Sequence, residues 1–273
     1  MNRTIAFIGG GNMARSLIGG LIARGVDAAR MIVADPAPAQ LASLAADYAL
    51  RTTSDNAQAA READVVVLAV KPQVMHDVVS GLAASLAGRS ALLISVAAGI
   101  RACDIRRWSG APAVVRCMPN RPALHGCGVT ALYATSDVSA ADRRLAQELL
   151  DAVGVTLWLE REDDMDAVTA ISGSGPAYFF WMVELLEQTG ASLGLSPEVS
   201  RILARETAFG AGAMVRSSAG SAAELREQVT SPGGTTEAAM KHLQTHGVAD
   251  MFAAAVRAAA RRSTELADEF GKR

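Results

Sequence analysis

Two threonines follow a proline and two glycines in the segment Ser231-Pro232-Gly233-Gly234-Thr235-Thr236. Proline disfavours continuation of a preceding helix, and glycines let the chain turn without side chains that fill space. A helix starting here would present backbone N–H groups that suit a carboxylate, and Thr235 and Thr236 would add hydroxyl donors at that positive end. A simple turn between helices is the alternative, but it would not require two threonines.

A glycine-rich turn is the second candidate site, and it follows a strand expected at residues 5–8. Gly9, Gly11 and Ala14 match the pattern G-x-G-x-x-G/A, which brings backbone close to a pyrophosphate at the N-terminus of a helix. A strand before the pattern and a helix after it favour dinucleotide binding over a bare turn. The pattern therefore predicts that this turn contacts a dinucleotide cofactor.

An acidic residue, Asp35, ends the next expected strand about 20 residues further on, as the dinucleotide pattern requires. Its carboxylate would accept hydrogen bonds from a ribose 2′-hydroxyl and repel a 2′-phosphate, which favours NAD(H). Residues 36–38 offer no arginine to offset this charge. Alternatively, Asp35 only starts a turn before Pro36.

Two further segments end expected strands at the carboxyl edge, where ligands bind in doubly wound sheets. Val70-Lys71-Pro72 ends one strand, and Lys71 either contacts the cofactor or is a solvated residue at the strand end. Ser95-Val96-Ala97-Ala98-Gly99 ends another, and its small residues leave room for a flat ring on the backbone.

The arrangement of apolar segments predicts the fold class. Near-continuous apolar runs indicate strands buried on both faces of a parallel sheet, joined by right-handed crossovers. Strands are expected at 5–8, 31–34, 65–70, 92–96, 114–118, 129–133 and 155–159, with a helix over 139–153. Helices are then expected over 164–171, 175–193, 197–217, 221–229, 235–245 and 248–269. We therefore expect an α/β protein with an N-terminal Rossmann-type doubly wound parallel sheet over residues 1–160 and an all-α domain over residues 161–273.

Composition excludes several function classes. The chain has 26 basic and 28 acidic residues, so no strong positive field favours nucleic acid or an anionic membrane. Its three cysteines have neither zinc-ligand spacing nor the density of a disulfide framework, which suggests a reducing cytoplasm. We expect a soluble cytoplasmic protein that binds no metal: His242 and His246 are four residues apart but lack the glutamate of a metal-binding HExxH motif.

The available side chains favour reduction of an imine over oxidation of an alcohol. Alcohol oxidation needs a base near the hydride path, and none of the four histidines forms a recognisable pair with a carboxylate. A protonated C=N group already carries its proton. Hydride delivery to it requires orientation, a site for a carboxylate and a hydrogen-bond donor near the nitrogen.

With these residues in view, the sequence resembles the 1-pyrroline-5-carboxylate reductase family over essentially its whole length. The first block, residues 7–14, is shared by many dehydrogenases, whereas Ser172-Gly173-Ser174-Gly175-Pro176-Ala177-Tyr178 followed by residues 231–236 is far more specific. Other matching blocks are Ala69-Val70-Lys71-Pro72, Ser95-Val96-Ala97-Ala98-Gly99, Arg116-Cys117-Met118-Pro119-Asn120 and Asp166-Ala167-Val168-Thr169.

The resemblance implies a nucleotide domain followed by a helical substrate-binding and dimerisation domain, in a homodimer or larger homo-oligomer with active sites shared between subunits. It implies reduction of the cyclic imine to L-proline with NADPH or NADH, usually NADPH. Thr236 would face the imine nitrogen, with Glu162 near the substrate and Ser231, Gly234 and Thr235 around its carboxylate. The cofactor contacts that the resemblance implies are Gly9, Gly10, Gly11, Asn12, Met13, Ala14, Asn56, Ala69, Val70, Lys71, Pro72 and Ala97.

Two positions depart from the family pattern. Asp35 stands where NADPH-preferring members often have Ser or Thr, which keeps NADH plausible, and Arg121 follows Asn120 where Thr is common. Two rival functions have the same fold class: a β-hydroxyacid dehydrogenase and a non-catalytic nucleotide-sensing protein. A β-hydroxyacid dehydrogenase would need a lysine in this region, but residues 175–240 contain none. The intact loop at 231–236 disfavours a non-catalytic nucleotide-sensing protein.

Overall fold

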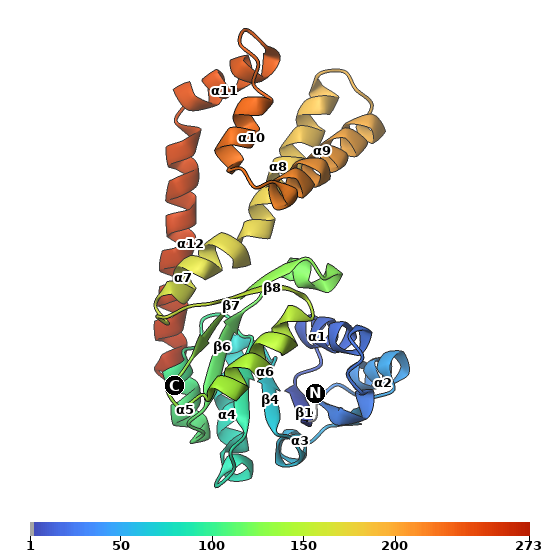
Figure 1. The fold of residues 1–273 in the computed structure, drawn as a ribbon, viewed down its shortest axis with the longest axis vertical. Helices are drawn as coiled ribbons and strands as arrows, with labels where there is room; N and C mark the ends of the chain where they lie inside the picture. The colour runs from blue at the N-terminus through green and yellow to red at the C-terminus, as the bar shows by residue number, and fades with distance from the viewer. Residues whose placement is uncertain (1–2) are drawn as a thin grey trace. The chain divides into compact units, whose positions relative to one another are not determined.

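The structure, a computed structural model, describes residues 3–273, which form two compact units. The first unit runs to Gly173 and also includes Ala259–Arg273, and the second unit is Ser174–Ala258. Figure 1 labels the helices and strands of both units. Within the described residues, no helix combines the length and the apolar character needed to cross a membrane.

An eight-stranded sheet forms the centre of the first unit, in the order β3-β2-β1-β4-β5-β6-β7-β8. Neighbouring strands are parallel except β6 and β7, because the segment 119–127 between them is too short for a crossover, which takes about a dozen or more residues. The expected parallel sheet is confirmed, with one antiparallel pair. The strands are β1 (Ile5–Ile8), β2 (Met31–Ala34), β3 (Arg51–Thr53), β4 (Val65–Leu68), β5 (Leu92–Ser95), β6 (Val114–Met118), β7 (Gly128–Ala134) and β8 (Gly154–Trp158).

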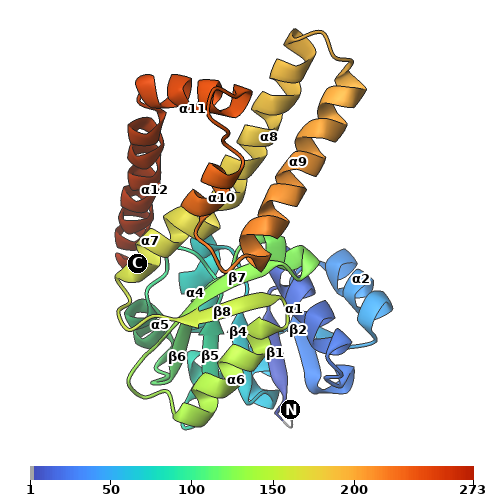
Figure 2. The same cartoon turned by 45° about the horizontal axis from the view of Figure 1, so that its top comes forward.

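Helices pack on both faces of this sheet, as Figures 1 and 2 show. Side chains of β1 alternate between the two layers: Ile5 and Phe7 belong to one buried apolar cluster, and Ala6 and Ile8 belong to the other. The first cluster contains residues of α1 (Asn12–Ala23), α2 (Pro38–Tyr48) and α6 (Ala140–Asp151). The second contains residues of α3 (Asn56–Glu62), α4 (Pro72–Leu86), α5 (Ala102–Ser109) and the end of α12 (Val248–Gly271).

Every predicted strand is present, and one strand was not predicted. β3 is short, and its residues Arg51, Thr52 and Thr53 are polar, so no apolar run marks it in the sequence. The helix expected over 164–171 is α7 (Asp164–Val168), continued by the π-helical segment η3 (Thr169–Gly173).

The division by packing differs from the predicted domain boundary after residue 160. Residues 161–173 and 259–273 belong to the first unit. The reason is a set of polar contacts around α7. The two carboxylate oxygens of Asp166 accept hydrogen bonds from Ser263 Oγ at 2.6 Å and Thr264 Oγ1 at 2.8 Å, both on the final part of α12.

The second unit is entirely helical, as predicted. Its helices are α8 (Gly175–Ser192), α9 (Pro197–Ser217), α10 (Ala222–Gln228), α11 (Thr235–Thr245) and the first part of α12. Figure 2 shows α8 and α9 side by side, joined by a short turn. Each of these helices, α12 included, begins and ends within two residues of its expected position, and the second half of α12 belongs to the first unit.

Few side chains of the second unit are buried. Among residues 174–258, those that are buried within α8 and α9 are Gly175, Ser200 and Ala204, whereas α10 and α11 have none. Large apolar side chains are exposed instead: Phe179 and Phe209 at 75%, Phe180 at 62% and Trp181 at 58%. Exposed apolar surface of this extent is typical of a protein–protein interface and unusual for a monomer.

Replacement by alanine of two glycines inside helices of the first unit should change the free energy of unfolding in opposite directions. A Cβ on Gly20, in α1, would lie 2.5 Å from the carbonyl oxygen of Ala152, whereas a Cβ on Gly81, in α4, would meet no atom within 4 Å. We expect Gly20→Ala to lower the free energy of unfolding by about 1–3 kcal/mol through overpacking. Gly81→Ala should raise it by about 0.5–1 kcal/mol because alanine favours helix.

Urea denaturation at one protein concentration, followed by circular dichroism, measures both changes. Equal effects of the two substitutions would contradict the close approach of α1 to Ala152.

Candidate active site

The glycine-rich turn lies between β1 and α1, at the carboxyl edge of the sheet. Gly9 has a φ of +99°, and a Cβ there would lie 2.8 Å from the carbonyl oxygen of Ala69, so only glycine fits. Gly11 is the N-cap of α1, and a Cβ on it would meet nothing within 4 Å. Among the described residues, no group accepts the N–H of Asn12 or Met13. The turn therefore presents free backbone donors to an open space.

Asp35 is held against this turn by both oxygens of its carboxylate. Oδ2 accepts the N–H of Gly10 at 2.8 Å, and Oδ1 accepts the N–H of Ala37 at 2.9 Å. The side chain of Gln40 donates to the carbonyl oxygen of Gly10. Asp35 thus has the turn-forming role that we considered as the alternative, and its charge lies next to the glycine-rich turn.

The segments expected to contact the cofactor lie along one edge of the sheet. The N–H of Ala69 donates to the carbonyl oxygen of Ile8 at 2.8 Å, which places residues 69–72 beside the glycine-rich turn. Lys71 is exposed and is the N-cap of α4, whose first residue is Pro72. Asn56 begins α3, and its neighbourhood is joined to Asp35 because the N–H of Asp35 donates to the carbonyl oxygen of Thr53 at 3.2 Å.

A cavity of about 280 Å³ opens at the same edge, between the turn and the ends of β5 and β6. Asn12 and Met13 line one side of it. Val96 and Ala98, the neighbours of Ala97, line the floor, and Ala97 itself is 6% exposed. The remaining lining residues are Met118, Pro119, Asn120, Arg121, Leu124 and Gly173.

The residues after β6 were not among the predicted site residues. Asn120 is nearly buried and uses its whole amide: Nδ2 donates to the carbonyl oxygen of Ser172 at 3.1 Å, and Oδ1 accepts the N–H of Val129 at 3.0 Å. It therefore fixes the wall of the cavity. The sequence does hold a signal for these residues, because they follow a buried strand at the edge where Lys71 and Ala97 lie.

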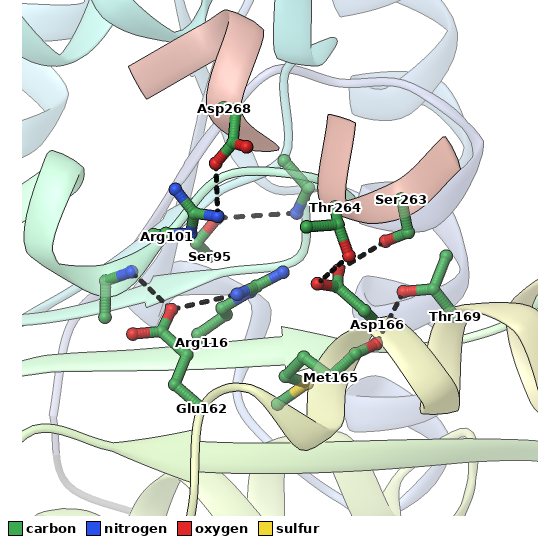
Figure 3. Close-up of polar contacts among 12 residues, drawn as sticks. Ser95, Arg101, Arg116, Glu162, Met165, Asp166, Thr169, Ser263, Thr264 and Asp268 are labelled. Carbon is green, nitrogen blue, oxygen red and sulfur yellow. Dashed lines mark hydrogen bonds and ion pairs between the residues drawn. The ribbon is translucent and has the colours of Figure 1, made fainter. Parts of the chain in front are cut away.

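Glu162 lies in the first unit and is bound from two sides (Figure 3). Its Oε1 accepts a hydrogen bond from Arg116 Nη1 at 2.9 Å and another from the N–H of Ala102 at 2.7 Å, at the start of α5. The Arg116 side chain is only 5% exposed, so Glu162 supplies the counter-charge that a buried guanidinium needs. Oε2 has no hydrogen-bond partner among the residues described by the structure.

The groups around Glu162 carry shifted pKa values. Burial raises the pKa of the Asp104 carboxyl, although Arg107 and Arg101 oppose this change. The pKa of the Cys103 thiol is raised by burial and then by the nearby charges of Asp104 and Glu162. A thiol with a raised pKa is a poor nucleophile, so we assign no nucleophilic role to Cys103.

The segment Ser231–Thr236 lies in the second unit and runs into the first turn of α11. Gly234 is the N-cap of α11 and has no side chain to accept the first N–H groups of the helix. Glu237 accepts the N–H of Gly233 at 2.7 Å. The hydroxyls of Ser231, Thr235 and Thr236 have no hydrogen-bond partner within residues 3–273, and Thr236 is half-buried whereas the other two are exposed.

No metal site is formed by the described part of the chain, in which no group of three or more His, Cys, Asp or Glu side chains could hold an ion. The rings of His242 and His246 lie 4.1 Å apart at the end of α11, and His246 Nδ1 is 2.8 Å from the carbonyl oxygen of His242.

Comparison with known proteins finds two family models that match this chain. Residues 162–266 match the family model for pyrroline-5-carboxylate reductase dimerisation, and residues 4–99 match the model for NADP oxidoreductase, coenzyme F420-dependent. Together these models span most of both units.

Individual relatives extend over nearly the whole chain. The structure of a pyrroline-5-carboxylate reductase from Coxiella burnetii has a TM-score of 0.92 and 40% identity, covering 97% of this chain and 99% of that one. The pyrroline carboxylate reductase of Plasmodium falciparum, solved with NADP bound, has a TM-score of 0.85 and 29% identity, with coverage of 97% and 98%. The pyrroline-5-carboxylate reductase of Pseudomonas aeruginosa is 50% identical over 269 residues, 98% of each chain, and this chain therefore belongs to the pyrroline-5-carboxylate reductase family.

Proposed function

We propose that this protein reduces 1-pyrroline-5-carboxylate to L-proline with a hydride from NADPH or NADH, the final step of proline biosynthesis. The observation that carries the proposal is the match to pyrroline-5-carboxylate reductases along 98% of this chain. The reaction adds a hydride to the carbon of the C=N bond and a proton to its nitrogen, which yields the secondary amine of proline.

The first unit has the groups that a dinucleotide needs. The free N–H groups of Asn12 and Met13, at the start of α1, suit a pyrophosphate, and the absent side chain at Gly11 leaves space for it. Ala97 and its neighbours would lie under the nicotinamide ring, and Asn56 would lie at the adenosine end. When bound, the reduced cofactor supplies the hydride, and the protein supplies orientation and exclusion of water.

Thr236 is the residue that we assign to the imine nitrogen. Its hydroxyl is uncommitted and sits in the first turn of α11, where a nearby negative group is stabilised by the helix end. Ser231, Gly234 and Thr235 would then hold the substrate carboxylate with hydroxyl and backbone donors. The N–H of Gly233 donates to Glu237, and the N–H of Gly234 donates to the carbonyl oxygen of Ser231 at 3.0 Å. Gly234 would therefore contribute space beside the carboxylate, and the backbone donors left for a ligand are those of Thr235 and Thr236.

Glu162 has a structural part and, in our proposal, a part in the active site. Its Oε1 is used by Arg116 and Ala102, whereas Oε2 is uncommitted within the described chain. Oε2 would lie near the positively charged imine and favour its protonated form. Arg116 then acts as a positioning residue, because it holds the carboxylate in one orientation.

The chain forms a homo-oligomer, since residues 162–266 match a dimerisation domain. The exposed aromatic side chains of α8 and α9 supply the apolar surface for that contact. We infer further that active sites are shared, with the nucleotide domain of one subunit and the loop Ser231–Thr236 of another. If so, a mixture of Gly11→Trp subunits and Thr236→Ala subunits should be more active than either variant alone; no gain on mixing would contradict sharing.

We place this activity in the cytoplasm. All three cysteines, Cys103, Cys117 and Cys127, are free thiols, which suits a reducing compartment. Burial also raises the pKa of the Cys117 thiol, so this cysteine stays protonated and unreactive.

The purified protein should oxidise NADPH or NADH when 1-pyrroline-5-carboxylate is added, as read from the absorbance of the reduced nicotinamide. L-Proline should accumulate in equal amount. If neither cofactor is consumed by protein with intact circular dichroism, the proposed function is wrong.

Thr236→Ala should lower kcat/KM by about 1–3 kcal/mol of transition-state stabilisation, because it removes one hydrogen bond to a charged group. Steady-state kinetics with the imine substrate measure the loss. Thr236→Ser retains the hydroxyl and should recover most of the rate.

Thr245→Ala is the matched control for this change, because Thr245 lies at the other end of α11 and its hydroxyl donates to the carbonyl oxygen of Lys241. It should leave kcat/KM unchanged. Equal kinetics of Thr236→Ala and the unmodified protein would remove Thr236 from the site.

Asp35→Ser should shift the ratio of kcat/KM values toward NADPH by about tenfold, since it removes a negative charge that repels the 2′-phosphate. Asp35→Asn is the control for charge alone, because its amide oxygen can still accept one backbone N–H of the turn. An unchanged ratio in both variants would mean that Asp35 only stabilises the turn, through its hydrogen bonds with Gly10 and Ala37, and has no part in cofactor preference.

A further inference from the structure

Arg121 is a charged residue on the wall of a cavity that is otherwise apolar or amide-lined. It shares the cavity with Asn12 and Met13 of α1 and with Val96 and Ala98 after β5. The backbone around it is fixed, because Asn120 is bonded to Ser172 and Val129, and the N–H of Ala123 donates to the carbonyl oxygen of Asn120 at 3.1 Å. The stem of Arg121 therefore starts from a rigid point.

The guanidinium of Arg121 has no hydrogen-bond or ion-pair partner within the described chain. In this respect it differs from Arg116 and Arg15, two other arginines near the sheet edge. Arg116, on the preceding strand, is paired with Glu162. Arg15, on α1, contacts Asp47 and lies 2.8 Å from Ser43 Oγ. A cation that lines a cavity and is left unpaired in the protein suits an anionic ligand.

The nearest place for an anion is the start of α1. The 3-10 helix η2 (Arg121–His125) runs beside α1: Ala123 and Leu124 of η2 and Ser16 and Gly19 of α1 line a second cavity together. Asn12 and Met13, whose N–H groups are free, line the first cavity together with Arg121. We propose that Arg121 binds the pyrophosphate of the dinucleotide across this cavity. The proposal rests on the proposed function, since it requires that the site binds a dinucleotide.

The order of the strands places Arg121 away from the residue that distinguishes NADH from NADPH. Asp35 follows β2, on one side of β1, whereas Arg121 follows β6, on the other side of β1. The 2′-phosphate lies at the adenosine end, near Asp35, but NADH and NADPH have the same pyrophosphate. Arg121 thus strengthens the binding of both cofactors equally and leaves the preference between them to Asp35.

The test is the binding of ADP-ribose, which has the pyrophosphate but neither nicotinamide nor a 2′-phosphate, measured by calorimetry on the full-length protein. We expect Arg121→Gln to raise the Kd about fivefold and to weaken its dependence on salt. Arg121→Lys should retain part of the affinity. Arg144→Gln is the matched control, because Arg144 is an exposed arginine of α6 that lines no cavity described here, and its Kd should stay unchanged.

The ratio of NADH to NADPH affinity should be the same in Arg121→Gln as in the unmodified protein. An unchanged Kd for ADP-ribose overturns the proposal, and so does a change confined to the binding of L-proline, which would assign Arg121 to the substrate carboxylate. Failure of the unmodified protein to bind ADP-ribose at all would instead contradict the proposed function.

Discussion

The first N–H groups of every α-helix have no acceptor inside the helix, and the groups that accept them explain much of this structure. Ser139, Ser196 and Ser221 accept such N–H groups at the starts of α6, α9 and α10. In contrast, α1 and α11 begin after Gly11 and Gly234, which have no side chain to do so. A glycine at that position costs the helix little, but it leaves positive backbone groups open to a ligand. The two helices whose starts are left open in this way are the two that follow the motifs singled out in the sequence.

At the start of α5, the acceptor for a free N–H group is a carboxylate from a distant part of the chain. The N–H of Ala102 donates to Glu162, and the same oxygen of Glu162 is the partner of the buried Arg116. Removal of one member of a buried pair costs about 3–5 kcal/mol because the other charge is left without a partner. The carboxylate is therefore held in place more firmly than a side chain on an exposed loop. Figure 3 shows that Asp166 makes a parallel set of bonds to α12, so the segment after the last strand is tied to the sheet domain.

The sequence predicted the strands, the helices and the glycine-rich turn because each depends on local patterns. Buried parallel strands are continuous apolar runs, and the turn is specified by glycine spacing. The contacts of Asp35 with Gly10 and Ala37 were not predictable, since they depend on the exact geometry of the strand end. The pairing of Arg116 with Glu162, 46 residues apart in the sequence, likewise has no local signal. β3 was not predicted because its residues are polar. The division of α12 between the two units was not predicted because it depends on tertiary packing.

The energetics of the second unit differ from those of the first. The sheet domain buries strands that are apolar along their whole length, whereas α8 to α11 leave Phe179, Phe209 and Trp181 largely exposed. Burial of one large aromatic side chain contributes about 1.5–3 kcal/mol, so several of them outweigh the marginal stability of a small helical unit. We therefore expect association through these helices to contribute to the folding of the second unit. Because the loop before α11 belongs to the same unit, the site that we propose for it should depend on that association, and substitutions in the exposed aromatic face should weaken stability and catalysis together.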